Sequence, residues 1–331
     1  MNKKVSIIMP VFNESASIRK SVDSIVNQTL KNFELIIVND GSTDETEDIC
    51  IELKQRYKNI VYIHQENKGP GAARNLGLEN ASGEYIGFVD ADDYIDSEMF
   101  ETMYSYAVKF DADIVQTGYS LVSSNGNLLR ERQYVSHDKL IEGREVLKEY
   151  AKNKITDVFL VTKLFKRDIL ENIRLPNYFY GEDQVTLVKA FDVANRLIVI
   201  PFIHYQYIMS EDSLVRGSFS QKVLDNFKAF QDMYNYYETH DAELKSFASE
   251  KICLTCVRTY KYLDNSLGKY NKTSIKNLFN DHYRLVKEEI AYNYLSKNKK
   301  LIYRLFSICP MLASILLNFK EDVRNYRRVN K

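Results

Sequence analysis

The stretch Tyr85–Asp93, YIGFVDADD, joins a short apolar run to three carboxylates, those of Asp90, Asp92 and Asp93. The apolar run predicts a buried strand, since a few consecutive apolar residues can cross a core. Three carboxylates directly after such a strand repel one another, and clustering them is costly unless a cation lies among them. An Asp-x-Asp step offers the oxygen ligands that Mg²⁺ and Mn²⁺ prefer. The alternative is a solvated acidic turn, because Asp is also a common turn residue.

Three further pairs of a strand and a helix precede this stretch. Apolar runs predict the strands, at Val5–Met9, Phe33–Val38 and Ile60–Ile63, and apolar residues at helical spacing follow the first two of them. This alternation indicates an α/β fold with a mainly parallel sheet flanked by helices. In open sheets of this kind, ligands bind beyond the carboxyl ends of the strands. We therefore expect the polar and glycine-rich loops at those ends to form one site.

The loop Gly69-Pro70-Gly71 and the nearby Arg74 differ from the common phosphate-binding fingerprints. No P-loop pattern occurs, and Arg74 stands where a dinucleotide fingerprint has its third glycine. A helix that begins after glycine and carries an arginine still suits a diphosphate. Arg74 could instead form a surface salt bridge with Glu79 or Asp44.

Asp40 follows the second predicted strand. It could accept a hydrogen bond from a nucleobase such as uracil, or it could cap the turn that begins at Gly41. Either Thr43 or Asp44 is expected to cap the helix that follows this turn.

The bulk composition is that of a folded protein with two domains. The chain has 331 residues, 45% of them apolar, and 45 basic residues balance 45 acidic ones, so no charge excess points to nucleic acid. We expect a first domain over residues 1–217 and a helical one over residues 218–331, because the pattern from Ser220 onward is almost wholly helical. Cys253 and Cys256 form a lone C-x-x-C and are expected to be buried core residues. Sparse cysteines and the lack of a signal-peptide pattern favour a cytoplasmic protein.

The segment Leu305–Phe319 carries no charge and is interrupted by Pro310. It is too short to span a bilayer, which needs about 20 apolar residues. Basic residues flank it on both sides, so a helix at about 298–319 could lie in a membrane interface. Packing on its own domain or on a second subunit is an equal alternative.

Several stretches together resemble the successive signatures of glycosyltransferase family 2. They are VSIIMPVFNE at Val5–Glu14, ELIIVNDGSTD at Glu34–Asp44, NKGPGAARNLG at Asn67–Gly77, YIGFVDADD at Tyr85–Asp93, TKLFKR at Thr162–Arg167 and GED at Gly181–Asp183. The resemblance covers about residues 5–216.

This resemblance implies a GT-A fold, a UDP-sugar donor, a divalent metal (Mn²⁺ or Mg²⁺) and inversion at the anomeric carbon. It implies the following donor-binding residues: Pro10, Val11, Phe12, Glu14, Asp40, Arg74, Asp90 and Ala91. The implied metal ligands are Asp92 and Asp90, and the implied general base is Asp183. Glu182 is expected to cap the following helix. His204, Ser213 and Arg216 occupy positions of late donor or metal contacts, although His204 fits a packed strand residue better.

The implied function is transfer of a hexose or N-acetylhexosamine to a hydroxyl of a glycan or lipid-linked acceptor, in capsule, exopolysaccharide or cell-wall glycan synthesis. The protein would lie in the cytoplasm or on the inner face of the cell membrane, and its C-terminal helices could form a homo-oligomer. One alternative is a haloacid-dehalogenase-like phosphotransferase, whose Asp-x-Asp motif follows the first strand and not the fourth. Another is a non-catalytic paralogue that binds a nucleotide-sugar.

Overall fold

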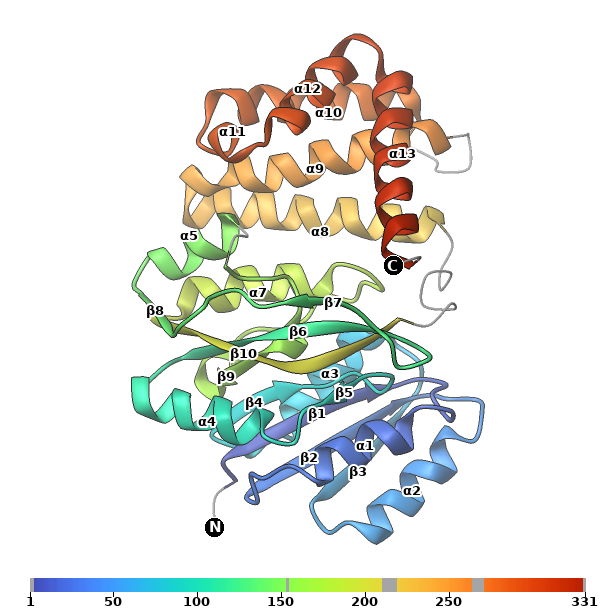
Figure 1. Cartoon of the computed structure of the whole chain (residues 1–331), viewed down its shortest axis with the longest axis vertical. Coiled ribbons are helices and arrows are strands. Elements are labelled where there is room, and N and C mark those ends of the chain that lie inside the picture. The colour runs from blue at the N-terminus through green and yellow to red at the C-terminus, as the bar shows by residue number, and fades with distance from the viewer. Residues whose placement is uncertain (1–2, 153–154, 210–218, 264–270, 330–331) are drawn as a thin grey trace. The chain divides into compact units, whose positions relative to one another are not determined.

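The computed structural model describes residues 3–152, 155–209, 219–263 and 271–329 (Figure 1). The chain divides into two compact units, Met1–Arg216 and Gly217–Lys331. The first unit contains a ten-stranded sheet with the order β3-β2-β1-β4-β9-β6-β10-β5, to which β7 and β8 are added beside β6 and β10.

The first half of this sheet is parallel, as the sequence predicts. It is formed by β1 (Val5–Val11), β2 (Phe33–Asp40), β3 (Ile60–Gln65) and β4 (Tyr85–Phe88), and the connecting helices are α1 (Ile18–Val26), α2 (Thr46–Arg56) and α3 (Pro70–Glu79). Every residue of β2 and of β4 is buried, which explains their nearly continuous apolar sequences. Parallel strands with helical crossovers bring the loops after β1, β2 and β4 to one edge of the sheet.

The second half of the sheet is mixed, so the expectation of a mainly parallel sheet holds only for the first half. Its strands are β5 (Tyr94–Ile95), β6 (Ile114–Ser123), β7 (Leu128–Arg132), β8 (Lys139–Glu142), β9 (Lys163–Lys166) and β10 (Arg196–Met209). The short strand β9 inserts between β4 and β6 and is antiparallel to both, whereas β10 is parallel to β6. The remaining elements of the unit are α4 (Met99–Phe110), α5 (Glu145–Lys152), the 3₁₀ helix η1 (Leu160–Thr162), α6 (Arg167–Leu170) and α7 (Glu182–Val193).

Helices cover both faces of the sheet. Gly77 of α3 packs directly on Ile8 of β1, and Gly87 of β4 packs on Phe100 of α4. Gly87 pairs with Ile7, whose side chain points to the opposite face from that of its neighbour Ile8. Helices α3 and α4 therefore lie on opposite faces, and the close approaches at Gly77 and Gly87 leave no room for a larger side chain.

The second unit is helical. It consists of α8 (Phe219–His240), α9 (Lys245–Thr259), α10 (Lys272–Glu288), α11 (Ala291–Tyr294), α12 (Lys297–Ile308) and α13 (Pro310–Val329), with short 3₁₀ helices at Ala242–Leu244 and Tyr260–Tyr262. Helix α10 begins with a capping box, in which Asn271 and Ser274 each accept a hydrogen bond from the other's backbone N–H. Cys253 and Cys256 are fully buried on α9, which confirms that they are core residues.

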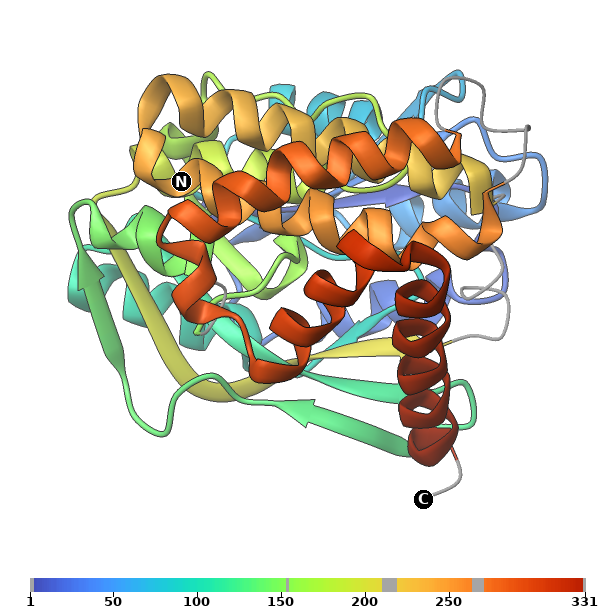
Figure 2. The same ribbon diagram turned by 90° about the horizontal axis from the view of Figure 1, so that it is seen from above.

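The C-terminal apolar segment forms two helices, which corrects the expected single helix at about 298–319 (Figure 2). Helix α12 ends at Ile308, and Pro310 begins α13, a position where proline is favoured because its missing N–H is not needed. Tyr303 and Phe306 are buried within the unit. Another set of apolar side chains is exposed: Ile308, Leu312, Ile315, Leu316 and Phe319. No helix among the described residues is long and apolar enough to cross a membrane.

Candidate active site

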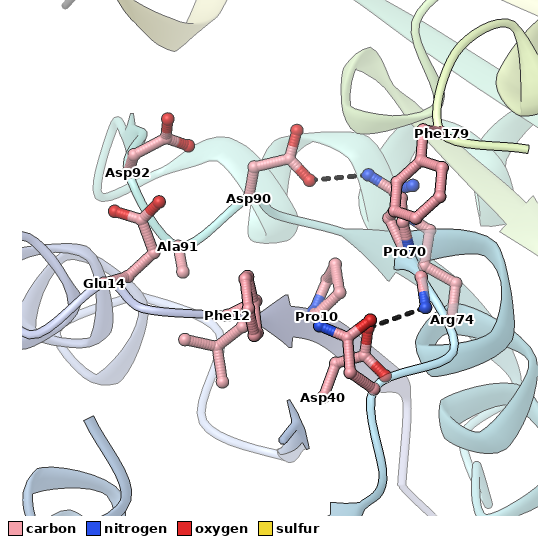
Figure 3. A pocket seen from close by; sticks show the side chains of 13 residues that line it. Pro10, Phe12, Glu14, Asp40, Pro70, Arg74, Asp90, Ala91, Asp92 and Phe179 are labelled. Carbon is pink, nitrogen blue, oxygen red and sulfur yellow. Dashed lines mark hydrogen bonds and ion pairs between the residues drawn. The ribbon is translucent and has the colours of Figure 1, made fainter. Parts of the chain in front are cut away.

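The loops at the carboxyl ends of β1, β2 and β4 border a pocket of about 290 Å³ (Figure 3). All nine residues that the resemblance implies for donor and metal binding line it: Pro10, Val11, Phe12, Glu14, Asp40, Arg74, Asp90, Ala91 and Asp92. The structure adds Asn67, Gly69, Pro70 and Phe179 to the lining. Residues from five separate parts of the chain thus come together at the edge of the sheet where ligands are expected.

The loops after β1 and β2 hold each other in place. Asn13, whose φ of 55° is left-handed, donates its N–H to Ser42 and accepts the N–H of Thr43. Asp44 accepts N–H groups from Ser15 and Thr46 and so holds the turn before α2. The N-cap of α2 is Glu45, whose side chain makes no capping hydrogen bond, which corrects the expected cap at Thr43 or Asp44. Burial alone would raise the pKa of Asp44, but the hydrogen bonds from Thr46 and Ser15 outweigh it and lower that pKa to about 2.

Asp40 is an anchor for the loop that leads into α3. Only 3% of the residue is exposed, and its carboxylate accepts hydrogen bonds from the backbone N–H groups of Lys68, at 2.9 Å, and Gly69, at 2.8 Å. It also accepts one from Nε2 of Gln65 at 2.6 Å. The structure therefore gives Asp40 a loop-organising role, on the loop at Gly69 and not on the turn at Gly41, and leaves it in the wall of the pocket.

Arg74 is buried beneath the pocket and contacts three carboxylates. One guanidinium nitrogen lies 2.8 Å from Oδ1 of Asp90, and the other lies 2.9 Å from Oε1 of Glu182 and 3.7 Å from Oδ1 of Asp183. The residue is 5% exposed, so the alternative of a surface salt bridge with Glu79 or Asp44 is wrong. Both of its terminal nitrogens are engaged by carboxylates. The electrostatic result is that one buried cation joins the loop after β4 to the start of α7.

Asp183 and Glu182 lie in the first turn of α7, after Gly181, whose φ of 85° favours glycine. Asp183 Oδ2 accepts the N–H of Leu160 at 3.3 Å, while Oδ1 is buried and receives no hydrogen bond from the described residues. Burial raises the pKa of Asp183, and the charge of Arg74 opposes this. Burial and the charge of Asp183 raise the pKa of Glu182 to about 8. Because the Glu182 carboxylate pairs with Arg74, the expectation that it serves only as a helix cap is corrected.

The three acids that follow β4 make different contacts, and two of them, Asp90 and Asp92, are drawn in Figure 3. Asp90 turns to Arg74, and Asp92 borders the pocket. Asp93 is 1% exposed and accepts the hydroxyl of Tyr205 at 2.7 Å and the N–H of Ile208 at 2.8 Å. Asp93 therefore holds this loop against β10 by two hydrogen bonds, which rules out a solvated acidic turn.

The family model described as "Glycosyl transferase family 2" matches residues 6–174. The chain belongs to this family. Glycosyltransferase GlyA of Streptococcus pneumoniae is 36% identical over 225 residues, which are 65% of this chain and 32% of GlyA. The poly(ribitol-phosphate) beta-glucosyltransferase of Bacillus spizizenii is 33% identical over 284 residues, which are 80% of this chain and 41% of that protein. This family member thus spans less than half the length of either relative.

The fold is also that of a solved structure. The crystal structure of S. aureus TarS 1-349 in complex with UDP-GlcNAc matches with a TM-score of 0.71 and 22% identity, covering 96% of this chain and 92% of that one. At this level of identity the likeness shows the fold alone, and it confirms the expected GT-A fold with helices after it. Family membership also decides against the haloacid-dehalogenase-like alternative.

The donor set at the pocket fits a divalent cation only in part. Among the described residues, no group of three or more His, Cys, Asp or Glu side chains could hold a metal ion. Asp90 is engaged by Arg74, which leaves Asp92, with Glu14 on the same side of the pocket, as the carboxylate source (Figure 3). Mg²⁺ is commonly held by one or two carboxylates together with substrate phosphates, so these residues fit a cation that arrives with a diphosphate.

The sequence-based prediction misses one aromatic residue of the pocket. Phe179 lines the pocket although it is 57% exposed, and the aromatic run from Tyr178 to Tyr180 was its only signal.

His204 is 7% exposed, lies 3.5 Å from Asp96 and does not line the pocket, which confirms that it is a packed strand residue. Ser213 and Arg216 lie outside the described residues.

Proposed function

We propose that this protein transfers a sugar, a hexose or an N-acetylhexosamine, from a UDP-sugar to a hydroxyl of a glycan or lipid-linked acceptor, with inversion and with a divalent metal. The observation that carries the proposal is the pair of contacts made by Arg74. It lies 2.8 Å from Asp90 at the pocket and 3.7 Å from Asp183 at the start of α7. A donor pocket and a candidate base are thus neighbours, as a single displacement requires.

The donor side of this proposal rests on the pocket lining. Phe12 and Pro10 offer apolar surface for a nucleoside, and Asp40 holds the loop that carries Gly69 and Pro70. This loop leads directly into α3, whose N-terminus favours the negative charge of a diphosphate. A divalent cation held by Asp92 would neutralise charge that develops on the leaving diphosphate.

The base of this proposal is Asp183. An inverting transfer needs a group that accepts the proton of the attacking hydroxyl, and a carboxylate of raised pKa holds that proton better. Asp183 Oδ1 receives no hydrogen bond from the described residues, so it can still accept one from the hydroxyl of the sugar acceptor. Arg74 and the N–H of Leu160 oppose the effect of burial on the pKa of Asp183 and keep the ionised form accessible.

The relatives support a role in a bacterial surface polysaccharide. The TarS structure with the same fold holds UDP-GlcNAc, and the Bacillus spizizenii relative is a glucosyltransferase of poly(ribitol-phosphate). A UDP-GlcNAc complex of the same fold and a glucosyltransferase among the relatives favour a UDP-linked N-acetylhexosamine or hexose for this chain.

The test is a panel of UDP-sugars given to the purified protein with Mn²⁺, with UDP release as the readout. We expect one donor to release UDP, and Asp183→Asn to abolish release while calorimetry still shows UDP binding. Failure of UDP to bind in the presence of Mn²⁺ would contradict the proposal. Loss of binding and transfer together in Asp183→Asn would show that the role of Asp183 is wrongly assigned.

We also propose that the exposed apolar side chains of α12 and α13 contact the inner face of the cell membrane. Ile308 is 81% exposed and Phe319 is 64% exposed, and Lys297 and Lys300 lie on the same pair of helices. Apolar side chains with nearby lysines suit an interface that contains anionic lipid. The protein should sediment with anionic vesicles, and Ile308→Ser with Phe319→Ser should not. A homo-oligomer that the same two changes dissociate, without sedimentation, would assign this face to a second subunit.

A further inference from the structure

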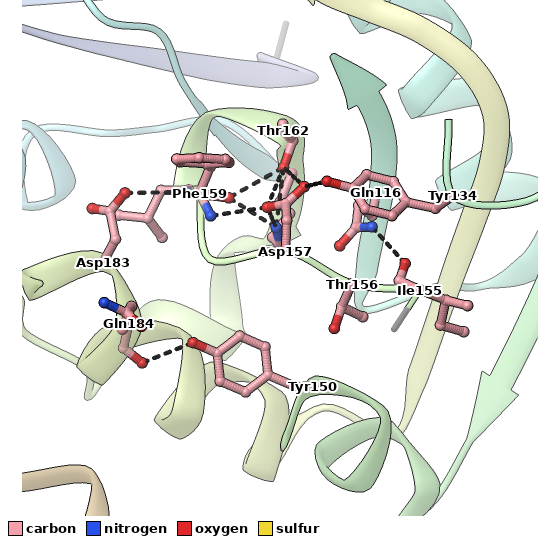
Figure 4. Close-up of polar contacts among 12 residues, drawn as sticks. Gln116, Tyr134, Tyr150, Ile155, Thr156, Asp157, Phe159, Thr162, Asp183 and Gln184 are labelled. Carbon is pink, nitrogen blue, oxygen red and sulfur yellow. Dashed lines mark hydrogen bonds and ion pairs between the residues drawn. The ribbon is translucent and has the colours of Figure 1, made fainter. Parts of the chain in front are cut away.

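The segment that precedes β9 contains a buried ion pair between Lys163 and Asp157, and Figure 4 shows Asp157 together with Asp183. Lys163, the first residue of β9, is fully buried, and its Nζ lies 2.6 Å from Oδ1 of Asp157. The same Nζ donates to the carbonyl oxygen of Phe159 at 2.8 Å and to Oγ1 of Thr162 at 3.0 Å. All three hydrogens of the ammonium group are therefore used within the segment that precedes β9.

The partner of this lysine is equally well satisfied. The Asp157 carboxylate accepts the N–H of Phe159 at 2.8 Å, the hydroxyl of Thr162 at 3.0 Å and the hydroxyl of Tyr134 at 2.6 Å (Figure 4). A buried ion pair is costly to form, and breaking it leaves an uncompensated charge. Because every hydrogen-bonding site is filled, this pair fixes the backbone between Asp157 and Lys163 in one conformation.

The same segment is anchored at its beginning. Gln116 of β6 donates to the carbonyl oxygen of Ile155 at 2.9 Å, and Thr156 donates to the carbonyl oxygen of Glu149 at 3.2 Å. Lys163 also pairs with Gln116 in the sheet. The segment is thus attached at both ends to β6 and α5, and its middle carries the backbone N–H of Leu160.

That N–H is the only hydrogen bond given to the Asp183 side chain by the described residues. From this geometry we propose that Lys163 and Asp157 are positioning residues, which hold the Leu160 N–H against Asp183 and so set the orientation and charge of that carboxylate. The role as a catalytic base rests on the proposed function, whereas the positioning itself does not.

The charged and titratable groups that act on Asp183 come from five elements. Arg74 on α3 and Lys163 on β9 favour its ionised form, as does the N–H of Leu160. Asp90 in the loop after β4 and Glu182 on α7 oppose it, and Tyr207 on β10 lies within the range of its charge. Removing the charge of Lys163, or letting the Leu160 N–H move away, therefore raises the pKa of Asp183.

The test measures the Asp183 carboxyl directly by carbon-13 NMR, with Asp183→Asn to assign the signal. Lys163→Met should raise the pKa of Asp183 by about one unit. The matched control is Lys166→Met. Lys166 lies on the same strand, but its side chain is one-third exposed and its ion pair with the exposed Asp111 is long, at 3.6 Å. The control should leave the pKa of Asp183 unchanged.

A second variant covers the case in which Lys163→Met does not fold. Asp157→Asn combined with Lys163→Met leaves no buried charge unpaired, and it should also raise the pKa of Asp183. An unchanged pKa in a folded variant of either kind would overturn the inference.

Kinetics separate this inference from the proposed function. If the wild-type protein transfers sugar, the variants should lose roughly tenfold to a hundredfold in kcat with the donor KM retained. Their rate should also rise to its plateau at a higher pH than that of the wild type. If the wild-type protein transfers no sugar, the proposed function fails, and the NMR measurement still decides the positioning role.

Discussion

The site has two walls: the donor wall, formed by the loops after β1, β2 and β3, and the wall at Asp183, formed by α7 and η1. Different interactions stabilise the two walls. In the loops after β1, β2 and β3, the carboxylates of Asp40 and Asp44 accept N–H groups from neighbouring loop backbone. Around α7 and η1, the buried side chains of Arg74 and Lys163 pair with the carboxylates of Glu182 and Asp157. The donor wall thus depends on backbone hydrogen bonds, and the wall at Asp183 depends on buried ion pairs.

This difference predicts which substitutions lower stability and which lower binding. A lost hydrogen bond to a loop has a modest net cost, whereas a buried charge without its partner costs several times more. Substitutions in the wall at Asp183 should therefore affect folding as well as activity, and those in the donor wall should mainly affect binding.

The largest expected effect is that of Arg74→Met, which would leave Asp90, Glu182 and Asp183 without their shared cation. We expect the free energy of unfolding to fall by about 3–5 kcal/mol, as measured by urea unfolding. The control is Arg174→Met, because the side chain of Arg174 is half exposed and its ion pair with Glu79 is long, at 4.0 Å. Equal stability of both variants would break the comparison between the two walls.

A smaller loss is expected for Asp40→Asn. The N–H groups of Lys68 and Gly69 bind different oxygens of Asp40, so the amide of Asn accepts one of them and directs its own hydrogens at the other N–H, at a cost of about 1–2 kcal/mol. UDP affinity, measured by calorimetry, should fall because the loop that carries Gly69 lines the pocket. Asp48→Asn, at an exposed position on α2, should change neither quantity. Unaltered UDP affinity in Asp40→Asn would argue against the anchoring role of Asp40.

The pH dependence of stability offers a third comparison. The pKa of Glu182 is about 8 in the folded protein, so the unfolded chain releases this proton at lower pH than the folded one. Above the unfolded pKa, near 4.5, stability should therefore decrease as pH rises, and the decrease should end near pH 8. Glu182→Gln imitates the protonated form, so its stability should be close to that of the wild type at pH 5 and clearly exceed it at pH 8. Parallel pH profiles for the two proteins would contradict this prediction.

The smallest effect on stability is expected for Asp92→Asn, since Asp92 borders the open pocket. Urea unfolding should be unchanged, while the enhancement of UDP binding by Mn²⁺, measured by calorimetry, should be lost. Binding of UDP that responds to Mn²⁺ as in the wild type would show that Asp92 holds no metal.

All of the pocket except Phe179 could be predicted from the sequence because its other loops directly follow predicted strands. Asp40, Asp90 and Asp92 were placed correctly for this reason, since parallel strands end at one edge of a sheet. The partners of Arg74 could not be predicted in the same way. Glu182 lies 108 residues further along the chain, and only the tertiary fold brings the two together.

The role of Asp93 and the place of β9 show the same limit. Nothing local distinguishes Asp93 from Asp92, and its burial follows from the position of Tyr205 on β10, 112 residues later. The four residues of β9 are too short for a pattern to show that they insert between β4 and β6. Local patterns therefore predicted the elements and the donor wall, whereas long-range pairing determined the other wall.

The guanidinium of Arg74 would couple donor binding to the charge of Asp183 in the proposed reaction. Asp90 and Asp183 draw on the same positive charge, so a cation that attracts Asp90 would leave more of that charge to Asp183. Asp183, the proposed base, would then lose its own proton more readily once a donor is in place. An empty pocket, by contrast, would keep the acceptor closer to its protonated state, which disfavours activation of a hydroxyl when no sugar is present.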